Sequence, residues 1–256
     1  FRIENLGVVP NLKKFPGARR SVARNVPIEL AACHFPRSVA SDAMKNIETS
    51  IFLSTLDRSV TSFAVVSATP GEGKSLFAVS LASVLSGASG KRAVLVDADM
   101  RKPRIHEVFS LRTAAPGLSD LLRNTEFRLN EVINSTAIEG LFVVPAGTNT
   151  TDPVSLLRSD RMKQLMDQLK EQFDYVVIDT PPILGFVDAR VICCNVDGAV
   201  LVTMQGKVSR VEVAGAVDAL NFGRTTNILG MILNKVDGGQ AGAFGNGFSS
   251  GYYRRY

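Results

Sequence analysis

Short apolar runs rich in Val, Ile and Leu alternate along the chain with segments of helical periodicity. Continuous apolar runs of this kind predict strands that are buried on both faces, and the periodic segments between them predict helices. The expected strands lie near residues 62–67, 92–96, 141–145, 175–179, 198–203 and 228–233. The expected helices lie near residues 37–54, 74–86, 118–134, 160–172 and 210–221.

This alternation predicts an α/β fold with a mainly parallel central sheet. Parallel strands need crossover connections, which are right-handed and place helices on both faces. The 256 residues and the hydrophobic content of 45% suit one such domain. We therefore expect a linker at 1–37, one domain at 38–237 and a tail at 238–256.

The first predicted strand runs into a glycine-rich turn at Ala68–Ser75, although Ala68 replaces the usual first glycine. Gly71 and Gly73 allow backbone N–H groups to close around phosphate oxygens, and the following helix directs its N-terminal dipole at the same anion. Lys74 can neutralise the β- and γ-phosphates, and the Ser75 hydroxyl can bind Mg²⁺. This P-loop predicts a nucleoside triphosphate site lined by Thr69, Pro70, Gly71, Glu72, Gly73, Lys74, Ser75 and Leu76.

Two further predicted strands end in aspartate. One leads into Asp97 and Asp99, and the other leads into Asp179. Ligands of open parallel sheets bind at the carboxyl ends of strands, so we expect these acids to meet the P-loop at one site. Carboxylates there can hold Mg²⁺, and one can accept a proton from an attacking hydroxyl. A single Asp after a strand can instead cap a helix, but two such strands beside a P-loop favour a site.

The motifs resemble those of one family. Val94–Pro103, with the pattern Asp-x-Asp-x-Arg, resembles the Walker A′ motif of the bacterial protein-tyrosine kinases (BY-kinases) of exopolysaccharide and capsule export. Val177–Pro182 resembles their Walker B motif, and Pro116–Leu122 and Asp152–Leu157 are also similar. The resemblance covers residues 38–256 and implies a P-loop NTPase of the MinD/ParA-like fold.

The resemblance also implies a reaction: Mg²⁺-dependent transfer of the γ-phosphoryl group of ATP to tyrosines of a neighbouring copy. It places Ser75, Asp99 and Asp179 at the metal. Asp97 is the candidate that orients or deprotonates the phenol, with Asp99 as the alternative. Arg101 is expected to pair with phosphate or with the acids, or to form a structural salt bridge. The catalytic candidates are thus Lys74, Asp97, Asp99 and Arg101.

The end of the chain carries the candidate acceptors. Of the four tyrosines, Tyr252, Tyr253 and Tyr256 lie in the last five residues. Six glycines lie among the fourteen positions from Gly238 to Gly251. Such a segment behaves as a flexible coil spanning about 20 Å, which is long enough to reach a neighbouring subunit. A sticky aromatic end without a catalytic role is the alternative interpretation.

The positive charge is confined to the beginning of the chain. Residues 1–37 hold seven basic and two acidic residues, which gives +5, and the remaining 22 basic and 22 acidic residues cancel. Its four prolines and its charge indicate a basic linker that is attracted to anionic lipid. An ordinary solvated tail is the alternative interpretation. The start lacks Met and looks cut from a longer protein. We therefore expect the cytoplasmic part of a bacterial inner-membrane protein, with no membrane span or signal peptide in this chain.

The cysteines and the charge balance limit the other classes of function. Three cysteines, two of them adjacent, fit a reduced compartment. Cys33 and His34 have no second pair at metal-binding spacing, so we expect no structural zinc. We also expect no nucleic-acid partner. The family implies as partners a transmembrane region or separate activator chain, neighbouring copies and a cognate tyrosine phosphatase.

Four points leave alternatives open. Asn234–Asp237 matches the base-recognition box of GTPases, and Asn234 is a candidate base contact for adenine or guanine. ParA/MinD-like ATPase switches share the Walker motifs but carry an extra lysine where this chain has Ala68–Pro70. A regulatory module whose tail docks export machinery is a third interpretation. Finally, Asp42, Lys45 and Glu48 occupy the family's ring-forming Glu-x-x-Arg-x-x-Arg positions, and the reversed charge at Glu48 predicts a mainly monomeric domain.

Overall fold

The computed structural model describes residues 3–11, 26–56, 59–87, 90–112, 115–222 and 226–237. In these residues eight strands form one sheet in the order β1-β8-β7-β2-β6-β3-β5-β4. They are β1 (Asn5–Pro10), β2 (Ser62–Ser67), β3 (Ala93–Asp97), β4 (Asn134–Ser135), β5 (Leu141–Val144), β6 (Tyr175–Asp179), β7 (Gly198–Met204) and β8 (Ile228–Val236). Every described pairing is parallel except that of β4 with β5. The predicted α/β fold with a mainly parallel sheet is confirmed.

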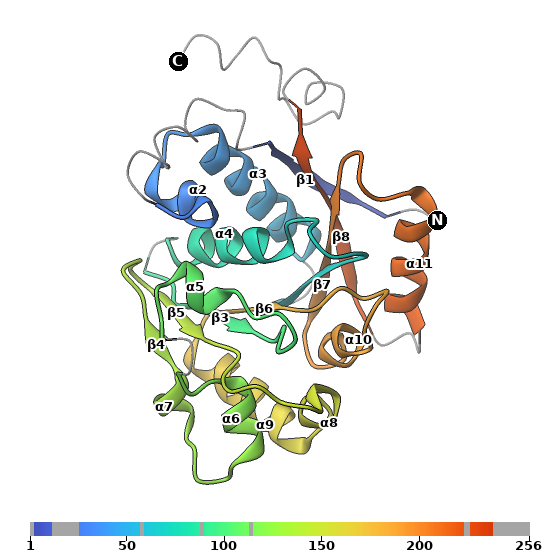
Figure 1. Cartoon of the computed structure of the whole chain (residues 1–256). Coiled ribbons are helices and arrows are strands. Elements are labelled where there is room, and N and C mark those ends of the chain that lie inside the picture. Colours follow the sequence, from blue (N-terminus) through green and yellow to red (C-terminus); the bar gives the residue numbers. More distant parts are fainter. Residues whose placement is uncertain are drawn as a thin grey trace.

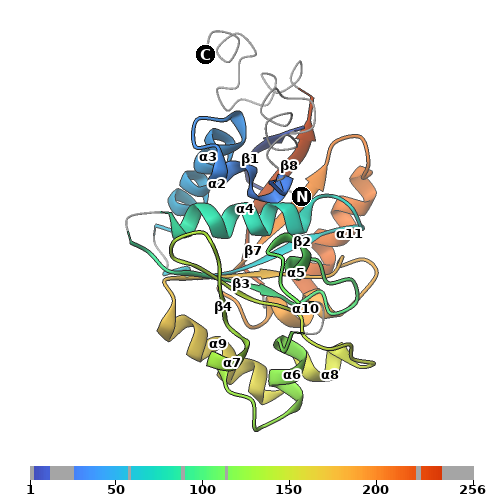
Figure 2. The same cartoon turned by 60° about the vertical axis from the view of Figure 1, so that its left-hand side comes forward.

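Helices cover both faces of this sheet, as Figures 1 and 2 show. One layer comprises η2 (Ile28–Leu30), α2 (Ala31–His34), α3 (Val39–Ser54), α4 (Lys74–Ser86) and α5 (Ile105–Val108). The other layer comprises α6 (Leu118–Arg123), α7 (Leu129–Val132), α8 (Pro153–Leu157), α9 (Asp160–Gln172), α10 (Asp188–Cys193) and α11 (Arg210–Asn221). The central strands are buried between the two layers, as their continuous apolar runs predicted.

Strand β2 shows how one apolar run serves two cores. Ala64 and Val66 pack in the cluster beneath α9, α10 and α11, whereas Phe63 and Val65 pack in the cluster beneath α3 and α4. Successive side chains of a strand point to opposite faces, so every residue of the run is buried. This two-sided packing fixes the strand, and with it the P-loop that follows.

The first strand corrects the expectation of an irregular linker at 1–37. β1 pairs in parallel with β8, with Val8 opposite Leu233. Leu6 and Val8 are 1% and 2% exposed, and residues 28–34 form η2 and α2. Proline and basic charge suggested a linker, but the short apolar stretch of β1 is stabilised by burial against α3. Pro10 is tolerated because it ends a strand at the edge of the sheet.

A second difference concerns the helix predicted over 118–134. The structure has two short helices there, α6 and α7. Asn124 follows α6 in an extended conformation, and its Oδ1 accepts the backbone N–H of Glu126 at 2.9 Å. Such local bonds compete with helix formation and end the helix. The elements β4, η2, α2, α5, α8 and α10 were also missed.

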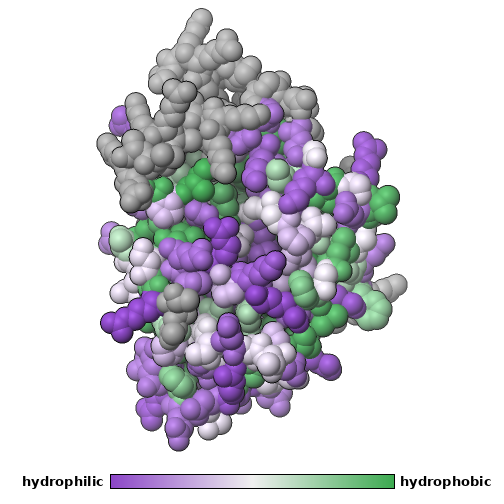
Figure 3. All heavy atoms as spheres, viewed as in Figure 1, coloured by the Kyte–Doolittle hydropathy of each residue, from purple (hydrophilic) through white to green (hydrophobic). Residues whose placement is uncertain are grey.

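Large hydrophobic side chains are exposed on α11 and on the segment that leads into α10. Figure 3 shows hydrophobic surface gathered over α11. The exposed residues of this surface are Leu184, Phe186, Val187, Val211 and Phe222. Within the described part of the chain, no helix combines the length and hydropathy required to span a bilayer.

Candidate nucleotide site

The P-loop joins β2 to α4. β2 ends at Ser67 and α4 begins at Lys74, so the predicted phosphate-binding residues form the connection. Gly71 and Gly73 have φ angles of +79° and +95°, a left-handed conformation that glycine adopts without strain. A Cβ on Gly73 would lie 1.9 Å from Nδ2 of Asn234, so no side chain fits there. The loop therefore has, at both glycines, the backbone shape that phosphate binding requires.

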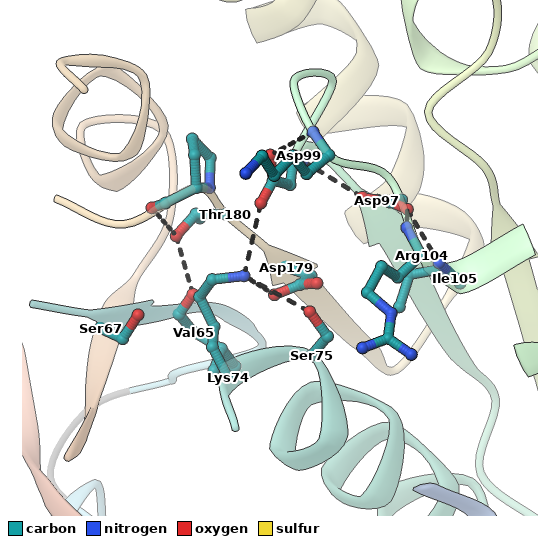
Figure 4. A network of polar contacts seen from close by, with 12 residues as sticks. Val65, Ser67, Lys74, Ser75, Asp97, Asp99, Arg104, Ile105, Asp179 and Thr180 are labelled. Carbon is teal, nitrogen blue, oxygen red and sulfur yellow. Dashed lines mark hydrogen bonds and ion pairs between the residues drawn. The ribbon is translucent and has the colours of Figure 1, made fainter. Parts of the chain in front are cut away.

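The Lys74 ammonium lies between the acids that end the neighbouring strands (Figure 4). Its Nζ donates to Oδ1 of Asp179 at 2.7 Å and lies 3.8 Å from Oδ2 of Asp99. The Ser75 Oγ atom is 3.5 Å from the same nitrogen. β2, β6 and β3 are consecutive neighbours in the sheet, which brings all these groups to one edge. The convergence expected from the sequence is observed.

Asp97 is fully buried beside Asp179. The two residues are direct partners in the register of β3 and β6. Oδ2 of Asp97 accepts the backbone N–H groups of Arg104 at 3.1 Å and Ile105 at 3.0 Å (Figure 4). Burial, together with the charge of Asp179, raises the pKa of Asp97 to about 7 in spite of these hydrogen bonds. The protonated form of this carboxyl group is therefore favoured more than in an exposed aspartate.

Asp99 is the more accessible of the two Walker A′ acids, at 7% exposed against 0% for Asp97. Burial raises the pKa of Asp99, while the charge of Lys74 opposes the rise. Its Oδ1 accepts the backbone N–H of Lys102 at 3.0 Å, and its Oδ2 is the oxygen nearest Lys74. Asp99 thus presents one oxygen to the space where Lys74 and Asp179 meet.

Arg101 is bound to an acid that the sequence analysis did not single out. Its Nε donates to Oδ1 of Asp188 at 3.0 Å and its Nη2 to Oδ2 at 3.2 Å. Asp188 is 1% exposed, and the ring of Phe186 lies 4.4 Å from the guanidinium carbon. Of the roles considered for Arg101, the structure shows an ion pair that ties the Walker A′ loop to α10. The only signal in the sequence was an acid within an apolar stretch just after Walker B.

Asn234 supports the P-loop from the end of β8. Its Nδ2 donates to the carbonyl oxygen of Glu72 at 2.7 Å, and its Oδ1 accepts the backbone N–H of Lys235 at 2.8 Å. The side chain is 2% exposed. Its predicted contact with the nucleotide base stays a prediction, and the position of Asn234 places it against the loop itself.

The remaining predicted P-loop residues bond within the loop or to its surroundings. Thr69 donates its backbone N–H to Oε1 of Glu72 at 2.5 Å. The Pro70 carbonyl oxygen accepts the ammonium of Lys207 at 2.5 Å. Leu76 is half-buried on the first turn of α4. The predicted acceptors Tyr252, Tyr253 and Tyr256 lie outside the described residues, as does the whole tail at 238–256.

The oxygen groups of the site suit Mg²⁺ only together with a polyphosphate. Among the described residues, no three His, Cys, Asp or Glu side chains are arranged to hold a metal ion. Asp99, Asp179 and Ser75 nevertheless place two carboxylates and a hydroxyl around the Lys74 ammonium. Mg²⁺ is commonly held by one or two carboxylates plus substrate phosphates, so this donor set fits the ion in its nucleotide complex.

A P-loop followed by Asp-ended neighbouring strands defines the class of the protein. Residues 59–239 match the ParA family, in the description "NUBPL iron-transfer P-loop NTPase". The match covers more than half of the chain. The chain is therefore a P-loop NTPase of the ParA type.

Individual relatives narrow the class further. Tyrosine-protein kinase YwqD of Bacillus subtilis is 35% identical over 223 residues, which are 87% of this chain and 90% of YwqD. Tyrosine-protein kinase ptk of Acinetobacter johnsonii is 30% identical over 86% of this chain, which spans 29% of that protein. The kinase domain of the Escherichia coli tyrosine kinase ETK superposes with a TM-score of 0.81 at 29% identity, covering 91% of this chain and 90% of that domain. The chain belongs to the bacterial tyrosine kinases (BY-kinases).

Proposed function

We propose that the chain is an autokinase that transfers the γ-phosphoryl group of ATP to Tyr252, Tyr253 and Tyr256 of a neighbouring copy. The observation that carries the proposal is the Lys74 ammonium between Asp179 and Asp99, at the mouth of a P-loop. An ammonium so placed can exchange its carboxylate partners for phosphate oxygens when a nucleotide binds. Stabilising charge and alignment is most of what a protein supplies in phosphoryl transfer.

The nucleotide contacts follow from the loop geometry. The backbone from Thr69 to Leu76 holds the phosphates, and Lys74 neutralises them. Ser75, Asp99 and Asp179 hold Mg²⁺, which when bound screens the charge of the phosphates and fixes their orientation. We propose ATP over GTP because the family resemblance favours it. Calorimetric titration of both nucleotides tests this choice, and a clear preference for GTP would overturn it.

Asp97 is the proposed group that orients or deprotonates the acceptor phenol. Its pKa of about 7 lies between those of an ordinary carboxylic acid and of a phenol, which suits proton acceptance near neutral pH. Asp99, whose Oδ2 faces Lys74, is assigned to the binding of Mg²⁺. Replacing Asp97 by Asn should lower kcat and spare MgATP binding, whereas Asp99→Asn should raise the Mg²⁺ concentration needed for half-maximal rate. The opposite pattern would exchange the two roles.

The surroundings of the site support a protein substrate. Leu184 donates its backbone N–H to the carbonyl oxygen of Ala68 at 3.2 Å, so the exposed hydrophobic surface next to it begins at the P-loop. An aromatic tail can pack on such a surface. Arg254 and Arg255 of the tail can neutralise new phosphate groups, and replacing both should change the phosphorylation rate.

The wider assignment follows the family resemblance. We propose that the chain acts at the cytoplasmic face of the bacterial inner membrane and regulates exopolysaccharide synthesis and export. Its partners would be its own transmembrane region or a separate activator chain, and a tyrosine phosphatase that reverses the modification. These statements concern a whole protein of which this chain can be one part.

One experiment separates the kinase from the two other interpretations. The purified chain is incubated with MgATP, and both phosphotyrosine and released phosphate are measured. We expect phosphotyrosine in the chain, its loss in the Tyr252→Phe, Tyr253→Phe, Tyr256→Phe triple variant, and unchanged nucleotide binding by that variant. Phosphate release without phosphotyrosine would favour an ATPase switch. If neither phosphotyrosine nor released phosphate is formed, the docking module is favoured.

A further inference from the structure

The outer side of the P-loop is held by a lysine that no motif includes. Lys207 follows β7 in the turn Met204–Lys207, which is closed by a hydrogen bond from the Lys207 N–H to the Met204 carbonyl oxygen at 3.2 Å. Gly206, the third residue of this turn, has φ of +72°, the conformation that a type II turn requires there. The turn therefore fixes the backbone of Lys207 at the carboxyl end of β7, beside that of β2.

The Lys207 ammonium lies against the first half of the P-loop. It donates to the carbonyl oxygen of Pro70 at 2.5 Å. A Cβ on Gly71 would lie 2.5 Å from the same nitrogen. The ammonium is thus packed on two successive residues of the loop, although most of the Lys207 side chain is exposed. Any change in the conformation of this half of the loop must displace it.

The same half of the loop carries a buried negative charge. Glu72 is 0% exposed, and its Oε1 accepts both the backbone N–H and the hydroxyl of Thr69, at 2.5 Å and 3.1 Å. Burial raises the pKa of Glu72. The hydrogen bonds that its carboxylate accepts from Thr69 and from the backbone of Met204 oppose this rise, and the charge of Lys207 opposes it to a smaller extent. An ionised carboxylate inside a loop that must bind a polyanion is electrostatically unfavourable unless a cation offsets it.

We propose that Lys207 is a positioning residue for the triphosphate, which holds the Pro70–Gly71 segment and offsets the charge of Glu72 within the P-loop. Lys207 acts through the loop and touches no reacting atom. The inference rests on the proposed nucleotide-binding function and adds a residue to it. It predicts that the loss of MgATP affinity caused by removing Lys207 depends on the charge of Glu72.

The test uses four variants of the full chain and calorimetric titration with MgATP. Lys207→Met removes the positive charge and the hydrogen-bond donor but keeps a side chain of similar length. Lys207→Arg keeps the charge and the donor. Lys207→Met/Glu72→Gln also removes the carboxylate charge, while Gln retains the Oε1 acceptor. The matched control is Lys163→Met, because Lys163 pairs with Asp160 on α9 in the opposite layer.

We expect Lys207→Met to raise the Kd for MgATP about tenfold, the size of one lost charge-assisted contact, with kcat at saturating MgATP little changed. Lys207→Arg and the control should bind MgATP like the wild type. The double variant should recover at least half of the MgATP affinity, on the free-energy scale, that Lys207→Met loses. Wild-type affinity in a folded Lys207→Met chain, or no recovery in the double variant, would overturn the inference. Failure of the wild type to bind MgATP would instead overturn the proposed function.

Discussion

At the scale of single residues, Lys74 has a structural role besides the proposed catalytic one. It is the cation closest to Asp179 and Asp99 in the described site, and all three side chains are buried. Removing one member of a buried ion pair leaves the other charge uncompensated, which costs more than a surface contact would. The same arrangement gives the nucleotide a preformed cation to bind.

Lys74→Met should therefore act in two ways. We expect phosphotyrosine formation to fall by about 100-fold or more, since the charge on the phosphates is no longer neutralised. We also expect the free energy of unfolding without nucleotide to fall by about 3 kcal/mol, because Asp179 and Asp99 lose their partner. Urea unfolding measures the second effect. Adding Asp179→Asn to Lys74→Met should restore part of the stability and none of the activity, and an equally unstable double variant would contradict this explanation.

Asp197 gives a prediction for pH dependence that is independent of the site. It precedes β7 and accepts hydrogen bonds from the backbone N–H groups of Thr61 and Ser62 and from Lys170, at 3.0, 2.9 and 2.6 Å. Burial alone would raise the pKa of Asp197, but these hydrogen bonds outweigh it and lower the pKa to about 2. A carboxyl group with a lowered pKa stabilises the fold above its unfolded pKa, and that contribution is lost as the pH falls through its folded pKa.

Asp197→Asn should lower the free energy of unfolding at pH 7 by about 1–2 kcal/mol, a range that allows for solvent screening of this partly exposed group. The difference from wild type should shrink as the pH falls from about 4 towards 2, where the native carboxyl group also becomes protonated. Urea unfolding across this pH range measures it. Asp218→Asn, at an exposed position on α11, is the control with little expected effect. A difference that stays constant with pH would show that the charge of Asp197 is not responsible.

At the scale of elements, the segment before α6 is set by a close backbone approach. A Cβ on Gly117 would lie 2.2 Å from the carbonyl oxygen of Pro145 and 2.4 Å from the backbone nitrogen of Gly147. Neither neighbour is a flexible side chain. The N–H of Gly117 also donates to Oδ2 of Asp120 at 3.0 Å, which begins the helix.

Gly117→Ala should therefore lower the free energy of unfolding by about 2 kcal/mol or more, since the added methyl group must push two backbone segments apart. Gly185→Ala is the matched control, because nothing lies within 4 Å of its added Cβ. Denaturant unfolding of both variants measures the difference. Equal stability of the two would contradict the packing described around Gly117.

The elements also show what the sequence could predict and why. The central strands and α4, α9 and α11 have strong local patterns, and the P-loop and the Asp-ended strands follow directly from them. β1 has no comparable local signal, because its stability comes from pairing with β8, more than two hundred residues away in the chain. Asp188 and Lys207 were missed for the same reason, since each acts on a loop that is distant in the sequence. Proline and positive charge at 1–37 predicted a linker because composition does not tell which distant residues a segment pairs with.

At the scale of the whole molecule, α3 carries the departure from the family's ring motif. Lys45 is exposed and Glu48 half-buried on this helix. Burial raises the pKa of Glu48, while the charge of Lys45 opposes the rise. A basic residue at this position would pair with an acidic neighbour in a ring, and Glu48 would repel it.

We therefore predict that the isolated chain sediments mainly as a monomer, and that Glu48→Arg increases the proportion of larger species. Autophosphorylation in trans then requires encounters between copies, so its rate per chain should rise with protein concentration. Sedimentation velocity and a dilution series of the kinase assay measure the two quantities. A stable ring in the wild type would show that other contacts outweigh Glu48.

The central claim is that one MgATP lies across the carboxyl ends of β2, β6 and β3. The measurement that tests it most directly is a crystal structure of the chain with Mg²⁺ and a non-hydrolysable ATP analogue. The account predicts the triphosphate in the P-loop, with Lys74 turned from Asp179 to the phosphates and Mg²⁺ beside Ser75, Asp99 and Asp179. A polyphosphate bound elsewhere, with Lys74 still paired to Asp179, would contradict it.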